Sequence, residues 1–431
     1  MPFIRARYSM SHISINIEPH ASMRKAINRP ADLALFGAPP LFAEPLHVGR
    51  PNTGNRDRLL ARINAVLDSR RLTNNGPMVK AFEKALADYL GVRHCVAVCN
   101  GTLALEIAIR ALNLTGEVIV PSFTFIATAH ALQWQQITPV FADIDPLTCN
   151  LSPASVESMI TPRTSGILGV HVWGRPCAVG ALQEIADRRG LKLMFDAAHA
   201  LGCSHRGRMV GNFGECEILS FHATKFLHTF EGGAIVTNNG ELAEKLRLAR
   251  NFGFRGADNV VCIGTNGKMN EVCAAMGLTG LESIADTISL NRANYERYAA
   301  RISDVPGLLL MRHDTAERTN YQYVVMQVQE EFGLERDTLL EILHAENVLA
   351  RRYFYPGCHA MEPYRSLFPD ARLSLPHTIA LSERVLSFPT GTAVGKKEID
   401  AIGRLLSFVA RHSARIRAHR GKRAAEKCSS S

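Results

Sequence analysis

Between about residues 45 and 300, short runs of apolar and β-branched residues alternate with stretches of helical periodicity. Apolar positions recur at helical spacing over 56–67 and 78–90, and the β-rich runs are bounded by polar segments. Strands that alternate with helices form βαβ units, so this order predicts an α/β fold with a mainly parallel sheet flanked by helices. The predicted strands are 94–99, 117–120, 139–144, 165–172, 191–195, 217–221 and 233–237.

At 431 residues the chain is too long for one small core, which favours a large domain and a smaller one. We expect a large domain over 45–300 that closes with a long helical stretch near 270–301. A smaller mixed C-terminal domain over 301–411 follows, with a strand at 321–327 and helices at 336–346 and 397–411. Residues 1–44 and 412–431 are expected to be a flexible N-terminal extension and a basic disordered tail.

The charge of the chain is concentrated in its tails. The whole chain carries +9, whereas residues 1–30 alone carry +4 and residues 411–431 carry +6, so the body is near −1. Basic tails of this kind are usually solvated, and the pattern therefore disfavours nucleic acid as a partner. No apolar run approaches the roughly 18 residues of a membrane span, and residues 1–30 lack the apolar core of a signal peptide.

Ten cysteines are scattered along the chain, without a Cys-x-x-Cys pair or a Cys/His group at metal-ligand spacing. Most stand in apolar contexts, which is typical of reduced, buried thiols. The pattern predicts a cytoplasmic protein and no metal site.

A lysine and an aspartate follow two of the predicted strands. Asp196 ends one strand, and Lys225 follows the next in Ser-Phe-His-Ala-Thr-Lys. Ligands of open α/β sheets sit at the carboxyl ends of the strands. Pyridoxal phosphate requires this pair of residues, because a lysine forms its Schiff base and a carboxylate keeps its pyridine nitrogen protonated. The two residues therefore predict a pyridoxal-phosphate enzyme. A helix N-cap or a buried salt bridge is the alternative role of Asp196.

A phosphate site is predicted where another strand turns into a helix at Asn-Gly-Thr. Free backbone N–H groups at a helix N-terminus hold anions, Gly101 admits a close approach, and Thr102 adds a hydroxyl. Ser220, at the end of the lysine-bearing strand, is a second candidate for the phosphate. A plain helix cap is the alternative for the Asn-Gly-Thr turn.

Two ring-bearing residues are candidates for contact with the cofactor. Phe125 follows a strand end and is expected to stack on the cofactor ring, although a core phenylalanine is the alternative. His199 lies three residues after Asp196, and it either touches the phenolic oxygen of the cofactor or completes a hydrogen-bond network.

Taken together, these segments resemble the DegT/DnrJ/StrS-type sugar aminotransferases, which are fold-type-I pyridoxal-phosphate enzymes, from about residue 46 to residue 406. Position 199 is histidine where many members have glutamine, and residues 1–44 and 412–431 extend beyond the usual family limits. Lysine at 225 disfavours the branch of dehydratases that carry histidine there. The matching segments are 73–77, 100–102, 121–125, 170–174, 196–200, 220–225, 231–233 and 264–271.

The resemblance implies a role for each candidate. Lys225 forms the Schiff base and shuttles the proton, Asp196 pairs with the pyridine nitrogen, and Phe125 stacks on the ring. Asn266 reaches the phosphate across a dimer interface, and Lys268 is a candidate to share that task, so the active form is a homodimer. The phosphate ligands implied within one subunit are Gly101, Thr102 and Ser220.

The implied reaction moves an amino group from L-glutamate to a keto-sugar nucleotide. The segments 251–254 and 263–271 most resemble members that aminate C4 of dTDP-4-keto-6-deoxyglucose. Amination of C3, or of a keto-cyclitol, remains open, as does a non-catalytic, DNA-associated regulator with the same fold. The residues expected to face the substrate are Lys268, Arg352, Tyr355 and His359, with a solvated pair as the alternative for Arg351 and Arg352.

Overall fold

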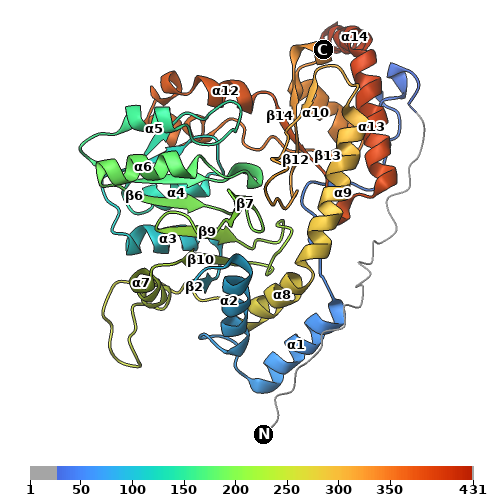
Figure 1. Cartoon of the computed structure of the whole chain (residues 1–431). Helices are drawn as coiled ribbons and strands as arrows, with labels where there is room; N and C mark the ends of the chain where they lie inside the picture. The colour runs from blue at the N-terminus through green and yellow to red at the C-terminus, as the bar shows by residue number, and fades with distance from the viewer. Residues whose placement is uncertain (1–26, 430–431) are drawn as a thin grey trace.

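The structure is a computed structural model that describes residues 27–429, with side chains described to residue 421 (Figure 1). A seven-stranded sheet forms its centre, in the order β2-β10-β9-β6-β5-β3-β4. All neighbours are parallel except β10, which is antiparallel to both β2 and β9. The predicted α/β class and all seven strands are confirmed. The strands are β2 (His94–Val98), β3 (Glu117–Pro121), β4 (Thr138–Ala142), β5 (Thr164–Val170), β6 (Lys192–Asp196), β9 (Cys216–Ser220) and β10 (Gly233–Thr237).

Helices cover both faces of this sheet. Val118 and Val120 of β3 pack in one apolar cluster, whereas Ile119 between them packs in another. Successive side chains of a strand point to opposite faces, so strands covered on both sides read as continuous apolar runs. The helices of this domain are α1 (Arg56–Ser69), α2 (Pro77–Leu90), α3 (Gly101–Ala111), α4 (Ala127–Gln133), α5 (Pro153–Met159), α6 (Val179–Arg189), α7 (Gly240–Arg250) and α8 (Glu271–Glu282).

The long helical stretch predicted near 270–301 is two helices, α8 and α9 (Ile284–Ile302). Ser283 separates them with a non-helical ψ of 13°, and its hydroxyl lies 3.4 Å and 3.3 Å from the carbonyl oxygens of Thr279 and Gly280. A serine hydroxyl that bonds back to the preceding turn competes with the backbone ladder and bends the helix. α9 then runs along the smaller domain (Figure 1).

The smaller domain is built on a three-stranded antiparallel sheet in the order β11-β12-β14. The predicted strand at 321–327 is displaced, since β12 runs from 324 to 328. The elements are β11 (Leu308–Leu310), β12 (Val324–Val328), β13 (Val348–Leu349), β14 (Val385–Phe388), α10 (Arg336–Ala345) and α13 (Lys396–Arg411). Short elements lie between and before them: β7 (Ser204–His205), β8 (Arg208–Met209), α11 (Tyr364–Leu367), α12 (Pro376–Ser382) and the 3-10 turns Val172–Gly174, Glu330–Phe332, Cys358–Ala360, Ala371–Ser374 and Gly391–Ala393.

The N-terminal extension packs on the smaller domain, contrary to the expectation that it is flexible. Leu33 and Phe42 are fully buried in the core of that domain. The buried carboxylate of Glu346 accepts hydrogen bonds of 2.7 Å from the backbone N–H groups of Ala34 and Leu41. The strand β1 (Leu46–His47) pairs in parallel with β13. The expectation of flexibility is therefore wrong for residues 27–44, and its other part, residues 1–26, lies outside the described residues.

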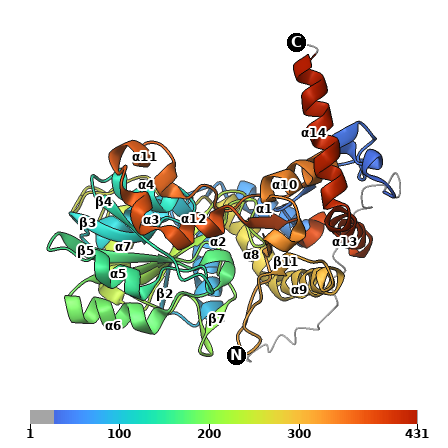
Figure 2. The same ribbon diagram turned by 90° about the horizontal axis from the view of Figure 1, so that it is seen from above.

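The predicted disordered tail is a helix, α14 (Ser413–Ser429), which extends from the smaller domain (Figure 2). Ile416 is fully buried against the core, and the ring of His419 lies 4.4 Å from that of Phe36. Arg420 pairs with Glu341 at 2.6 Å. The prediction of disorder was wrong for α14 because one apolar residue and one ion pair hold the start of this basic segment in place. Between residues 27 and 429, no helix has the length and apolar character needed to cross a lipid bilayer.

Candidate active site

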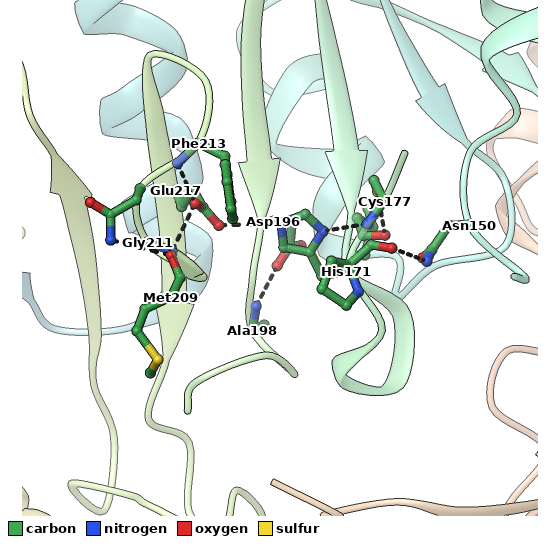
Figure 3. Close-up of polar contacts among 12 residues, drawn as sticks. Asn150, His171, Cys177, Asp196, Ala198, Met209, Gly211, Phe213 and Glu217 are labelled. Carbon is green, nitrogen blue, oxygen red and sulfur yellow. Dashed lines mark hydrogen bonds and ion pairs between the residues drawn. The ribbon is translucent and has the colours of Figure 1, made fainter. Parts of the chain in front are cut away.

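Asp196 ends β6 and turns its side chain into a buried site. Its Oδ2 accepts a hydrogen bond of 2.9 Å from the hydroxyl of Thr128. Its Oδ1 accepts one of 3.0 Å from the N–H of Ala198, as Figure 3 shows. Burial raises the pKa of this carboxyl, against the lowering effect of both hydrogen bonds and of the Lys225 charge. The hydrogen bonds and the lysine charge do not fully offset the cost of burying this carboxylate. A positively charged group bound next to it would therefore stabilise its ionised form.

Lys225 lies in the loop between β9 and β10, close enough to Asp196 for their charges to interact. Its Nζ donates to the phenolic oxygen of Tyr323 at 3.4 Å. Burial lowers the pKa of Lys225 to about 8, and the Asp196 charge opposes this effect. About a tenth of the amine is therefore neutral at pH 7, far more than for an exposed lysine, and nucleophilic chemistry at a lysine requires this form.

An anion cradle lies where α3 begins. The Oδ1 of Asn100 accepts a hydrogen bond of 2.8 Å from the N–H of Leu103 and so caps the helix. A β-carbon at Gly101 would lie 3.1 Å from the Cβ and 3.3 Å from the Oγ of Ser220, so the absence of a side chain keeps this space open. The N-terminus of α3 and the Ser220 hydroxyl thus face each other, with Thr102 exposed in the first turn. A phosphate group fits this arrangement.

His199 is buried behind Lys225. Its Nδ1 accepts a hydrogen bond of 3.2 Å from the N–H of Trp173. Burial, and then the charge of Lys225, hold the pKa of His199 well below its ordinary value. The ring is therefore neutral and carries its hydrogen on Nε2. It packs against the rings of Tyr323 and Phe354, with centroids 4.6 Å and 5.7 Å away.

Phe125 lies at the open side of the same region. Its side chain is 58% exposed, and its carbonyl accepts a hydrogen bond from the N–H of Thr128. Thr128, which holds Asp196, thus also anchors the turn before α4 that carries Phe125. The exposed ring is not a core phenylalanine.

A second polar cluster ties together the strands beside Asp196 (Figure 3). The N–H of His171 donates to the carbonyl of Asp196 at 2.9 Å, while its Nδ1 accepts from the N–H of Cys177 at 3.0 Å. The Nε2 lies 3.2 Å from Oε2 of Glu217, which is fully buried. The other oxygen of Glu217 accepts 2.7 Å bonds from the N–H groups of Gly211 and Phe213. This cluster fixes the loops around the site.

A cavity opens beside Thr224 and Tyr323, between the N-terminal segment and the smaller domain. It encloses about 560 Å³, including the space at its open mouth. Tyr323, which bonds Lys225, connects this cavity to the reactive lysine. The lining consists of His47, Val48, Gly49, Thr224, Gln322, Tyr323, Leu349, Arg351 and Tyr353.

The structure does not bring two predicted substrate residues, Arg352 and Tyr355, to this cavity. Arg352 pairs with Asp337 of α10 at 3.2 Å and lies over the ring of Tyr355, at 4.5 Å from its centroid. The guanidinium of Arg336, also from α10, lies 4.7 Å from the same ring. Arg351, which was not among the predicted substrate residues, lines the cavity instead.

His359 is also placed away from the cavity lining. It is buried, and its Nδ1 lies 2.7 Å from the hydroxyl of Ser122, immediately after β3. The same hydroxyl accepts a hydrogen bond from the N–H of His359 at 3.0 Å. These contacts hold the loop of the smaller domain against the central sheet.

Asn266 and Lys268 lie on a loop that passes the start of α3. Gly267 accepts a hydrogen bond of 2.9 Å from the N–H of Cys99, and Lys268 donates to Asn251 at 2.8 Å. Asn266 is exposed. Within the described part of one protomer, no hydrogen bond or ion pair joins either residue to Lys225 or Asp196. Their predicted role across a dimer interface stays a prediction.

The sequence reasoning missed two residues that contact the central pair. Thr128, which bonds Asp196, stands in a short helix without a recognisable motif. Tyr323 is separated from Lys225 by 98 residues. Neither left a signal in the sequence that could have identified it.

The site combines three features: a half-buried lysine of lowered pKa, a buried carboxylate, and an anion cradle at a helix N-terminus. This combination is typical of one class of enzymes. Such a site is that of an enzyme of pyridoxal-phosphate type, since each part fits one part of that cofactor.

The chain belongs to the DegT/DnrJ/EryC1/StrS aminotransferase family, whose model matches residues 54–407. It is thus a member of a family of sugar aminotransferases, and the predictions of family, enzyme class and fold type are confirmed. A relative in Shigella dysenteriae, named dTDP-4-amino-4,6-dideoxy-D-glucose transaminase, is 38% identical over 81% of this chain and 98% of its own length. A GDP-perosamine synthase of Caulobacter vibrioides is 34% identical over 78% and 91%.

Among solved structures, the chain is similar to DesI, crystallised in the presence of its TDP-sugar product. The two share 49% identity and a TM-score of 0.87, over 91% of this chain and all of that one.

Proposed function

We propose that this protein transfers an amino group from L-glutamate to C4 of dTDP-4-keto-6-deoxyglucose, with pyridoxal phosphate as its cofactor. The observation that carries the proposal is the 49% identity to DesI over that protein's whole length, together with the Lys225–Asp196 pair. The name of the Shigella relative places the amino group at C4 of a dTDP-sugar. The GDP-sugar relative is more distant from this chain.

Each part of the site has a partner on the proposed cofactor. When bound, pyridoxal phosphate supplies an electron-withdrawing ring that makes the carbon bearing the amino group acidic. Asp196 would hold the ring nitrogen protonated. The positive charge of that nitrogen would in turn stabilise the buried carboxylate of Asp196. Gly101, Thr102 and Ser220 would bind the phosphate.

Two further side chains would position the ring. The exposed face of Phe125 would stack on it. Nε2–H of His199 would donate to its phenolic oxygen, because the Trp173 amide occupies the other nitrogen.

Lys225 would hold the cofactor and move the proton. Its lowered pKa keeps part of the amine neutral, as a general base requires. Burial raises the pKa of Tyr323, whose phenol therefore stays protonated and able to orient the Nζ of Lys225.

The active form is proposed to be a homodimer. One loop exposes five apolar side chains, a density that is typical of a surface covered by a partner. A second copy seated there would bring Asn266 of the same segment to its neighbour's phosphate. Ile263→Asp should convert the dimer to monomers in sedimentation velocity, whereas the equally exposed Leu373→Asp should not. A monomeric parent protein would contradict the proposal. The exposed residues are Phe252, Phe254, Val260, Val261 and Ile263.

The reaction is tested in two half-reactions. Purified protein with bound cofactor should lose its visible absorbance with L-glutamate, and the desalted product should regain it with dTDP-4-keto-6-deoxyglucose. Lys225→Ala should show neither change. Loss without recovery would contradict the substrate and favour a 3-keto sugar or a keto-cyclitol. No loss with glutamate would favour the non-catalytic alternative. A cytoplasmic location stays a prediction.

A further inference from the structure

We propose that Arg351 binds the diphosphate of the sugar nucleotide in the cavity beside Lys225. The inference rests on the proposed function and assigns a part of the substrate to a part of the structure. It starts from the chemistry of the cavity wall. The described residues that line it include one permanent cation, Arg351, and neither an aspartate nor a glutamate. Such a wall favours an anionic ligand.

Arg351 is held in place, and no carboxylate of the described residues pairs with it. Its backbone N–H and C=O pair with Ser387 of β14 at 3.0 Å and 2.8 Å. Its guanidinium lies 5.2 Å from the centroid of the Tyr353 ring. In the part of the chain that the structure describes, no carboxylate pairs with this guanidinium. Its planar fork is therefore free to donate two N–H bonds to two oxygens of a phosphate, the geometry that arginine recognises best.

The neighbouring Arg352, unlike Arg351, is already paired with a carboxylate and does not line the cavity. It is paired with Asp337 and lies against Tyr355, outside the cavity lining. A guanidinium already neutralised by a carboxylate gives little additional attraction to an anion. Two consecutive arginines thus have different environments, and only the first faces the cavity.

The position of the cavity suits a sugar nucleotide whose keto group lies at Lys225. Tyr323 both lines the cavity and bonds the Nζ of Lys225, and Thr224 lines it immediately before Lys225. A keto group at the reactive lysine would therefore leave the rest of the ligand in the cavity.

The test measures binding of dTDP to protein with bound cofactor by isothermal titration calorimetry. Arg351→Ala should weaken dTDP about 10- to 100-fold, since hydrogen bonds to charged groups contribute about 1.5–3 kcal/mol. Arg352→Ala, the matched control, should change the dissociation constant less than threefold. Arg351→Lys should recover part of the affinity. Thymidine, which has no phosphate, should bind all four proteins equally.

A second experiment uses glutamate, because its carboxylates are the other anionic groups that Arg351 could bind during the reaction. The rate and KM of absorbance loss with glutamate should be unchanged in Arg351→Ala. If that KM rises while dTDP binding is unchanged, Arg351 binds the amino donor and the proposal is wrong. If both are unchanged, the cavity is not a substrate site. Parent protein that reacts with glutamate but binds no dTDP would contradict the proposed substrate and this inference together.

Discussion

The hydroxyl of Thr128 donates to the buried Oδ2 of Asp196 at 2.9 Å, and the turn that ends in Thr128 begins at Phe125. One short segment therefore supports both the carboxylate that would pair with the cofactor nitrogen and the ring that would stack on the cofactor.

Thr128→Val should weaken cofactor retention. Valine has nearly the shape of threonine but leaves one oxygen of Asp196 without its donor, which should raise the pKa of the carboxyl further and reduce its charge. We expect at least a tenfold faster loss of cofactor on dialysis, followed by absorbance. Thr128→Ser keeps the hydroxyl and should resemble the parent. Equal losses in both variants would show that the methyl group, rather than the hydrogen bond, matters.

Gly101→Ala should fill the anion cradle. The new methyl group would lie 3.1 Å from Cβ of Ser220, tighter than ordinary van der Waals contact, and would displace a phosphate bound between them. Cofactor affinity, measured by fluorescence titration, should fall at least about tenfold, the effect of losing one charge-assisted hydrogen bond. Gly180→Ala in α6, where a β-carbon has no neighbour within 4 Å, is the control and should leave affinity unchanged. Unchanged affinity in both variants would contradict the cradle.

Cofactor uptake by the cofactor-free protein should increase with pH. Only the neutral amine of Lys225 attacks an aldehyde, and burial lowers its pKa to about 8. The rate should rise about tenfold from pH 6 to pH 7 and level off above pH 8. An exposed lysine would instead keep rising past pH 9. Stopped-flow absorbance measures the rate, and a rise that continues past pH 9 would show that Lys225 is not desolvated.

Truncation after Arg411 should destabilise the smaller domain, whereas truncation after Gly421 should not. The first removes the buried Ile416 and the ion pair of Arg420 with Glu341, and the second leaves both. Loss of a buried isoleucine costs about 2–5 kcal/mol, so thermal unfolding should begin several degrees lower. The variant Ile416→Ala should reproduce most of the change. Identical unfolding of both truncated proteins would mean that α14 contributes no stability.

The sequence was sufficient for the central sheet and for the residues at its edge. Strands buried on both faces leave continuous apolar runs, so the ends of these runs locate Asp196, Gly101 and Ser220 within a residue or two. The same logic identified Lys225, because it follows such a run and precedes a Gly-Gly strand entry.

The sequence did not allow contacts between distant segments to be predicted. Tyr323 meets Lys225 only after the two domains have packed, and Thr128 meets Asp196 only after α4 has packed on the central sheet. The choice between Arg351 and Arg352 depends on which way each side chain turns from the loop, which composition does not encode. The C-terminal segment has the sequence pattern of a solvated basic tail, because it contains many charged residues and only one isoleucine that could anchor it.

The contact between Phe36 and His419 brings a segment near the start of the described chain beside α14, on one side of the smaller domain. The chain could therefore be joined at this contact and opened elsewhere without changing the fold. A circularly permuted chain, joined by a short linker across this contact and opened at the exposed turn around Leu147, would keep every residue of the active site in place.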